Sequence, residues 1–257
     1  MLSFGWYFYY GLTLSKVNPV LFVNRLDFTR NILMLTNLQG MLLKYFWLRV
    51  SFDVIYCLLP ILLAFAVLKE KYYTKWVVVV TILFNMCYGI FMASFTYISL
   101  DLYIAWFYVP FVFYPNTAKG YYFSFHSIRI VFLLIFFTAG IWKIRTGAIF
   151  NADQMSGILL LQHKQYLAGN PSNWFSQLVY FLVQHSYYSY VLYLLGTIAE
   201  LAFIIGFFTK KYDKWLMVAF LLFFIADYFL MRINYSNWMV FAGLLYFSQL
   251  KKEKYEI

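Results

Sequence analysis

The sequence predicts an all-α, polytopic transmembrane helix bundle, and three observations lead to that fold class. Of the 257 residues, 64% are hydrophobic and only 12% are charged, whereas soluble domains have roughly 45–50% apolar and about 25% charged residues. Several apolar stretches approach or exceed about 20 residues, the length that crosses a bilayer as a helix. Most lysines fall between those stretches. This composition excludes a water-soluble globule and a disordered chain.

Seven stretches are predicted as firm membrane spans. They are residues 45–68, 76–98, 102–114, 123–142, 188–208, 215–231 and 235–250, of which the third and the last are short. Residues 2–14 are also apolar and could form a shortened first span or an interfacial helix. No basic segment precedes them and no A-x-A site follows, so a cleavable signal peptide is not expected. Because no linker or internal repeat interrupts the sequence, we expect a single membrane domain, residues 1–257.

The loop lysines predict how the chain is oriented. Cytoplasmic loops of membrane proteins carry an excess of basic residues. With seven spans, ten lysines share one side: Lys69, Lys71, Lys75, Lys119, Lys210, Lys211, Lys214, Lys251, Lys252 and Lys254. This side, with the C-terminus, is therefore predicted to be cytoplasmic. The net charge of +10 then reflects orientation, and we expect contact with membrane lipids and no nucleic acid.

Residues 15–44 and 143–187 are then extracytoplasmic. The first segment contains NRLDFTRNILMLTN, a candidate amphipathic helix, and the second continues after Pro171 with an apolar stripe at helical spacing. The stripe consists of Trp174, Phe175, Leu178, Phe181 and Leu182. We predict outer interfacial helices here. Packing of the second stripe against the bundle is an equally good interpretation.

Ionisable residues within spans are costly, so each one suggests a structural or functional contact. Arg49 and Asp53 are four residues apart and can pair on one helical face. Arg129 and Lys143 lie on one predicted helix about 21 Å apart, too far for one site. With the topology above, Arg129 and Glu200 both lie toward the inner half of the membrane. We therefore predict that Arg129 and Glu200 form a structural intramembrane pair.

Lys143 and three carboxylates, those of Asp53, Asp101 and Asp227, fall on the outer side of the predicted bundle. A partly desolvated lysine at a helix end can lose its proton and act as a base. The other interpretation is an interfacial lysine whose stem lies along apolar surface. Under the first interpretation, Lys143, Asp227 and Asp101 are the candidate catalytic residues. The histidines and cysteines lack the spacing of a metal site, so no metal is expected.

Two stretches of the chain carry a recognisable pattern. Residues 127–147 read SIRIVFLLIFFTAGIWKIRTG, and residues 196–208 read GTIAELAFIIGFF. The first stretch contains an arginine (Arg129), an Ala-Gly pair (Ala139 and Gly140) and a lysine followed by an aliphatic residue (Lys143 and Ile144). The second stretch contains an acidic residue, Glu200. The pattern resembles the horizontally transferred transmembrane (HTTM) domain family, which includes the membrane part of vitamin K-dependent γ-carboxylase. The resemblance covers about residues 45–250.

The resemblance implies a function for Lys143. In the γ-carboxylase, the lysine at this place is the base that starts the reaction. A reduced quinone and oxygen then give a strong base, which removes a proton from a peptide glutamate, and carbon dioxide adds to the carbanion. Carried over, Lys143 would be the base on the extracytoplasmic side and a reduced quinone the cofactor. The chain departs from the family at Asp227 and near Asp101, where histidines are usual, and it ends without a large peptide-binding domain.

Two hypotheses follow for the function. The first is a membrane enzyme that uses Lys143 as a base at an outward-facing, lipid- or quinone-accessible site. The second is a non-catalytic membrane subunit or chaperone that binds a secreted or membrane protein. A transporter is less favoured, because the sequence shows no inverted repeat and no pair of Gly/Pro-broken helices. From the family's largely bacterial range we expect the bacterial cytoplasmic membrane.

Overall fold

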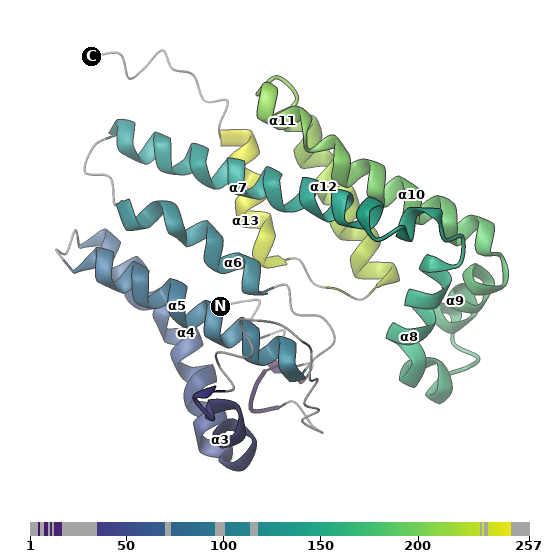
Figure 1. Ribbon diagram of the computed structural model, residues 1–257, viewed down its shortest axis with the longest axis horizontal. Coiled ribbons are helices and arrows are strands. Elements are labelled where there is room, and N and C mark those ends of the chain that lie inside the picture. The colour runs from purple at the N-terminus through teal and green to yellow at the C-terminus, as the bar shows by residue number, and fades with distance from the viewer. Residues whose placement is uncertain are drawn as a thin grey trace. The chain divides into compact units, whose positions relative to one another are not determined.

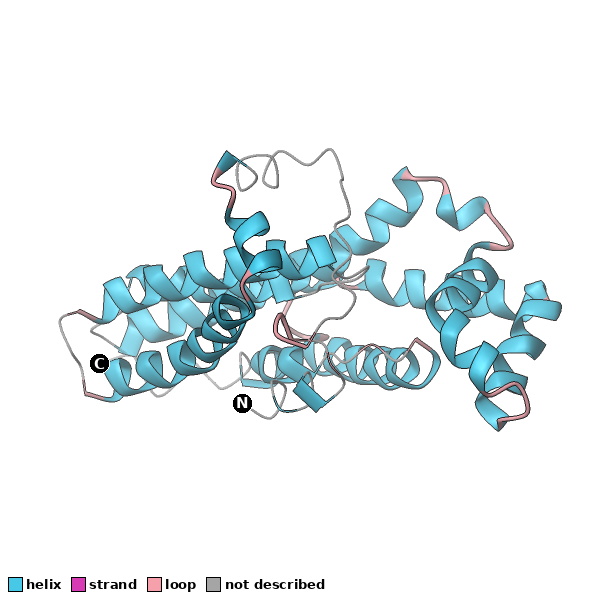
Figure 2. Cartoon of the chain, turned by 90° about the horizontal axis from the view of Figure 1, so that it is seen from below, coloured by secondary structure: helices cyan, strands magenta, loops and turns pink. Residues whose placement is uncertain are grey.

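The computed structural model describes residues 5, 8–9, 11, 13–16, 35–69, 73–95, 101–113, 118–231, 233 and 236–247. These residues form helices and connecting turns, with no strand among them (Figure 2). The predicted all-α class is therefore confirmed. The chain divides into two compact units, Met1–Ser124 and Phe125–Ile257.

The N-terminal unit is built on two long helices, α4 (Phe46–Leu68) and α5 (Thr74–Phe95). The helix α3 (Leu38–Lys44) packs against α4, and α6 (Asp101–Tyr108) with the 3-10 helix η1 (Val109–Phe113) packs against α5 (Figure 1). Polar side chains bond to carbonyls of their own helix, as Thr81 Oγ1 does to Val77 O at 2.7 Å. Such bonds satisfy polar groups that an apolar phase cannot. One core cluster among the described residues consists of Leu14, Leu42, Tyr88, Phe91 and Met92.

The C-terminal unit contains most of α7 and all later helices. They are α7 (Ala118–Arg145), η2 (Ala148–Phe150), α8 (Gln154–Gly169), α9 (Trp174–Gln184), α10 (Ser186–Ala202), α11 (Ile205–Phe208), α12 (Asp213–Leu230) and α13 (Ser236–Phe247). The helices α8 and α9 pack together against α10, and α12 packs against α10 and α13 (Figure 1). A cluster that includes Leu159, Phe175, Val179, Leu182 and Tyr193 joins the first three.

Aromatic rings fix α7 within this unit. Phe136 stacks on Phe203 at a centroid distance of 4.9 Å and meets the ring of Trp238 at 5.8 Å. Phe132 meets the ring of Phe220 edge to face at 5.2 Å. Edge-to-face and offset contacts of this kind add stability beyond the apolar area that they bury. They place α7 in contact with residues of α12 and α13 and with the end of α10.

In the part of the chain that the structure describes, four helical segments are long and apolar enough to cross a membrane. They are Phe46–Leu68, Thr74–Met92, Tyr122–Arg145 and Ser186–Phe208, which correspond to the first, second, fourth and fifth predicted spans. These segments are compatible with an integral membrane protein. The other three predicted spans are not confirmed: α6 has 8 residues, α12 carries three charges within 18 residues, and α13 has 12 residues.

The predicted helix after Pro171 is present as α9. Asn173 caps it by accepting a hydrogen bond from Phe175 N at 3.0 Å. The predicted stripe is divided between two environments, because Phe175 is buried in the core cluster whereas Trp174 and Phe181 are exposed. Packing on the bundle therefore accounts for only part of the stripe.

Several predictions fall on residues that the structure does not describe. Most of residues 2–14, residues 17–34 of the predicted extracytoplasmic segment 15–44 and the C-terminal lysines lie outside the described residues. The same holds for the side chain of Asp101, although its backbone begins α6.

Candidate functional site

Gly140 allows two helices of the C-terminal unit to approach closely. A Cβ atom at this position would lie 2.9 Å from side-chain atoms of Leu201 and 3.3 Å from its backbone nitrogen. A larger residue would therefore push α10 away from α7. Because Glu200 precedes Leu201, this approach brings a carboxylate to the end of α7.

Lys143 and Glu200 form an ion pair at this approach. Lys143 Nζ donates to Oε1 of Glu200 at 2.9 Å and lies 2.8 Å from Oε2. The Lys143 side chain is 25% exposed and that of Glu200 is 6% exposed. Oε2 accepts no hydrogen bond of good geometry from the described residues. The pair therefore combines a partly exposed ammonium with a buried carboxylate whose two oxygens both lie close to it.

One face of α10 supplies the inner wall of this site. Tyr193, Thr197 and Glu200 are buried and recur at intervals of four and three residues, which is one helical face. The Tyr193 ring centroid lies 5.1 Å from Lys143 Nζ, within the range of a cation–π contact. Thr197 bonds to Tyr193 O at 2.8 Å, which satisfies its hydroxyl within the helix. Lys143 is therefore held by a carboxylate and an aromatic face from the same helix.

Arg129 has a different partner from the one that the sequence predicted. Its Nε donates to Asp213 Oδ2 at 2.8 Å, and its Nη2 bonds to Oδ1 of the same carboxylate. The Nη2 atom also donates to Gly206 O at 2.7 Å. The side chains of Arg129 and Asp213 are 1% and 0% exposed. The predicted Arg129–Glu200 pair is therefore wrong, and each of the two residues pairs with another charge.

The antiparallel course of the chain explains this correction. Moving back along the chain from η2 into α7, Ile149 O accepts a hydrogen bond from Tyr190, Lys143 bonds to Glu200, and Arg129 bonds to Asp213. The basic residues are 14 positions apart and the acidic ones 13, so antiparallel segments can match both pairs. That similar spacing was the available signal. It was missed because Asp213 lies in the basic segment KKYDK, which we interpreted as a loop.

Asp53 belongs to a separate site in the N-terminal unit. Its Oδ1 accepts hydrogen bonds from Tyr88 Oη at 2.6 Å and Leu14 N at 3.1 Å, and its Oδ2 accepts one from Ser15 N at 2.9 Å. Asp53 therefore anchors the turn at residues 13–16 to α4, in place of the predicted contact with Arg49. No sequence pattern indicates Tyr88 as the partner of Asp53.

The other two predicted carboxylates, Asp227 and Asp101, lie on different helices. Asp227 lies on α12, partly buried, and its peptide oxygen accepts a bond from Met231 N at 2.8 Å. Asp101 is the first residue of α6. Lys143 and Asp227 thus belong to the C-terminal unit, and Asp53 and Asp101 belong to the N-terminal one. Their convergence around Lys143 stays a prediction.

Two histidines of the C-terminal unit, His163 and His185, contact main-chain oxygens. His163 Nε2 lies 2.7 Å from Leu230 O, and His185 Nδ1 lies 3.0 Å from Phe181 O. Across the described side chains, no group of three or more His, Cys, Asp or Glu residues is placed to hold a metal ion. The contacts of these two histidines are those of residues that support helix ends.

The Lys143–Glu200 pair joins the two stretches that carry the family resemblance. Lys143 belongs to residues 127–147 and Glu200 to residues 196–208. Such proximity is required of a shared site, and it also arises when two helices merely pack together. No family model, curated protein or solved structure matches the chain, so membership of the HTTM family stays a prediction.

Proposed function

We propose that the chain is an integral membrane enzyme of the HTTM and γ-carboxylase-like type, in which Lys143 acts as a base and Glu200 receives its proton. The observation that supports this is the Lys143–Glu200 contact at 2.8 Å, between a partly exposed ammonium and a nearly buried carboxylate. A lysine must lose its proton before it can act as a base. Glu200 is the adjacent group that can take it.

The contact gives this proton transfer a direct path. One proton moved across the hydrogen bond converts an ammonium and a carboxylate into a neutral amine and a neutral acid. The heavy atoms need not move for this step. The neutral amine of Lys143 would then face the exposed side of the site and accept a proton from a substrate.

A reduced quinone could reach Lys143 from the exposed side of its ammonium. Lys143 Nζ could bond to a ring oxygen of the quinone beside the Tyr193 ring, whose centroid lies 5.1 Å from Nζ. When bound, a quinol together with oxygen would supply the strong base that a weakly acidic C–H bond requires. Lys143 and Tyr193 are therefore the residues that would hold it.

The proposal includes the seven-span topology. That topology places Lys143 on the extracytoplasmic side of a bacterial cytoplasmic membrane and the C-terminus inside. A secreted peptide, a membrane protein or a lipid would then be the substrate. The basic loops described above support this orientation.

Lys143→Arg is the variant that tests the base. Arginine keeps the positive charge and can still bond to Glu200, but it does not release its proton in proteins. The purified chain would be placed in nanodiscs with a reduced naphthoquinone under oxygen, and the rate of quinol loss measured. We expect Lys143→Arg to lose about 100-fold in rate or more, the ordinary contribution of a general base, without loss of folded protein.

Arg145→Ala is the matched control, because Arg145 is an exposed cation near the same end of α7. It should retain the wild-type rate. Full activity in Lys143→Arg would contradict a base at this position. Quinol loss by the wild-type chain no faster than in empty nanodiscs would contradict the use of a quinol.

A non-catalytic membrane subunit is the second candidate function. The close, hydrogen-bonded geometry of the Lys143–Glu200 pair favours it, because the same contact can serve to hold α7 against α10. In that case Lys143→Arg would keep both the fold and the capacity to bind a protein partner. The wild-type rate of quinol loss therefore separates the two candidates, because a non-catalytic subunit would show none above empty nanodiscs.

A further inference from the structure

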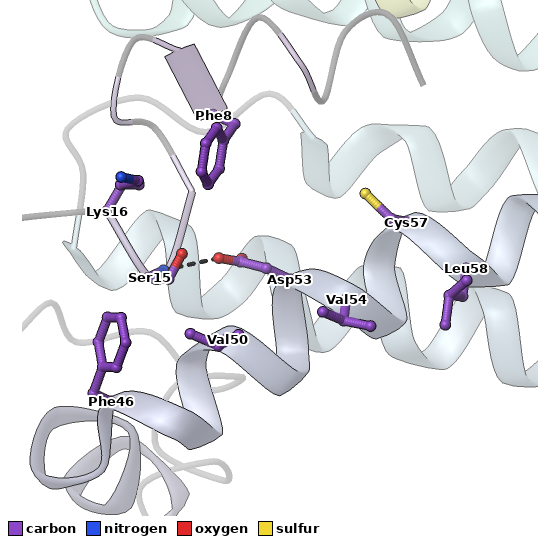
Figure 3. Close-up of a pocket in the computed structure, with 9 residues that line it drawn as sticks. All are labelled: Phe8, Ser15, Lys16, Phe46, Val50, Asp53, Val54, Cys57 and Leu58. Atoms are coloured by element: carbon purple, nitrogen blue, oxygen red, sulfur yellow. Dashed lines mark hydrogen bonds between the residues drawn. The ribbon is translucent and has the colours of Figure 1, made fainter.

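A pocket of about 540 Å³ lies in the N-terminal unit, between α4 and the preceding residues (Figure 3). Its volume is in the range of small-molecule sites, roughly 300–1,000 Å³. The α4 wall is largely apolar, with Val50, Val54 and Leu58 following one another along the helix. Phe8, Ser15 and Lys16 form the opposite wall (Figure 3).

Asp53 holds this opposite wall in place. Its carboxylate accepts the backbone N–H groups of Leu14 and Ser15 and the hydroxyl of Tyr88. Three donors therefore stabilise its negative charge, and the turn at residues 13–16 is fixed against α4.

Lys16 gives the pocket a positive charge. The residue is exposed, its ammonium lies 4.7 Å from the ring centroid of Phe8, and it forms no ion pair with any described side chain. Arg49 adds a second cation near Phe46, another lining residue, with 5.6 Å between guanidinium and ring centroid. Its Nε atom finds no hydrogen-bond acceptor among the described residues.

The pocket also lies at a suitable depth in the predicted membrane. Its α4 residues run from Phe46, where the candidate span begins, to Leu58. Twelve residues of helix cover about 18 Å. This length is close to the thickness of one leaflet, which is half of a hydrocarbon core about 30 Å thick. In Figure 3, Lys16 lies toward the Phe46 end of this row. Charge at the helix end and apolar surface toward the span interior match an amphiphile.

We propose that this pocket binds an anionic phospholipid, with the phosphate at Lys16 and one acyl chain along Val50, Val54 and Leu58. Basic groups at the membrane surface attract anionic lipid, and the apolar row shields the chain from water. The site uses no residue of the Lys143–Glu200 pair. It therefore stands or falls independently of the enzymatic proposal.

Native mass spectrometry of the full chain tests the charge contact. The protein would be released from detergent with added phosphatidylglycerol or phosphatidylcholine, and the fraction that retains lipid measured. We expect the wild type to retain phosphatidylglycerol preferentially, and Lys16→Gln to lower that retention about fivefold, the effect of one basic group near the surface. Lys44→Gln is the control, because Lys44 is also exposed and lies over an aromatic ring, that of Tyr45, outside the pocket.

A second pair of variants tests the acyl-chain contact. Val54→Trp would fill the pocket, whereas Leu62→Trp adds the same bulk at another exposed position of α4. We expect only Val54→Trp to lower phosphatidylglycerol retention. Equal retention of both lipids by the wild type would overturn the proposal. Equal losses of phosphatidylglycerol retention in a variant and in its control would also overturn it. Unchanged phosphatidylglycerol retention in Lys16→Gln would overturn it too, and is the result expected if another protein segment fills the pocket.

Discussion

Arg129 and Lys143 stand on the same helix, but their side chains suit different tasks. Arg129 is buried and donates to both oxygens of Asp213 and to a peptide oxygen, which uses the planar fork of a guanidinium. Lys143 is partly exposed and has one carboxylate partner. An ammonium can release its proton, whereas a guanidinium does not. Arg129 is therefore the structural contact, and Lys143 is the candidate for chemistry.

Arg129→Met should destabilise the C-terminal unit strongly. It would leave the Asp213 carboxylate buried without its charge partner, and such losses cost about 3–5 kcal/mol. The double variant Arg129→Met with Asp213→Leu should recover most of that stability, because no uncompensated charge remains. Thermal unfolding in detergent would measure both effects. A double variant as unstable as the single one would argue against the Arg129–Asp213 contact as the cause.

At the scale of elements, Gly140 and Gly206 mark two close approaches. A Cβ at Gly206 would lie 2.6 Å from a side-chain atom of Leu133, and one at Gly140 would lie 2.9 Å from Leu201. Each approach lies beside one ion pair. Gly140 lies near the Lys143–Glu200 pair, and the carbonyl oxygen of Gly206 accepts a hydrogen bond from Arg129. Small residues let helix backbones come close, as is common within membranes. The glycines and the charges together define how the segments pack.

Gly140→Ala should destabilise the chain by about 1–3 kcal/mol through overpacking against Leu201. Gly157→Ala is the matched control, because nothing lies within 4 Å of a Cβ at that position of α8. Alanine there should be neutral or stabilising by up to about 1 kcal/mol, since glycine weakens a helix interior. Unfolding temperatures of the two variants would show the difference. Equal temperatures would mean that α10 does not press on α7 at Gly140.

The sequence was sufficient to predict where the long helices lie, but not which side chains bond between them. The predicted span 45–68 corresponds to α4, Phe46–Leu68, because an apolar run in lipid must satisfy its own backbone. It also identified Arg129, Lys143 and Glu200 as residues that need partners. It paired them wrongly, because helical periodicity gives the face of each residue but not the register between two helices. The tertiary bonds of Asp53 to Leu14, Ser15 and Tyr88 lay beyond it for the same reason.

For the whole molecule, the number of membrane crossings decides which side each site faces. The described helices include four candidate spans, and the proposed topology has seven. The two arrangements place the turn between α8 and α9 differently. With seven crossings this turn and the loop after α4 lie on opposite sides, and with only those four they share a side. A measurement at these two loops therefore distinguishes the arrangements.

Single cysteines at Lys69 and Ser172 would make that measurement. Both residues are exposed, and the native Cys57 and Cys87 would first be replaced by alanine. In intact cells, a membrane-impermeant maleimide should label Ser172→Cys and spare Lys69→Cys, because the latter is predicted to be cytoplasmic. Labelling of both after cell lysis is the control. The same accessibility at both positions in intact cells would refute the seven-span arrangement.

The two ion pairs of α7 together prevent it from sliding. Arg129 and Lys143 are about 21 Å apart along the helix, and both are bonded to the antiparallel return of the chain. A shift by one residue would move α7 by 1.5 Å and turn it by about 100°, which would break both contacts at once. Screw-like motion of α7 is thus blocked. A movement of α7 that uncovers Glu200 must either move the packed segments with it or break the fully buried Arg129–Asp213 pair.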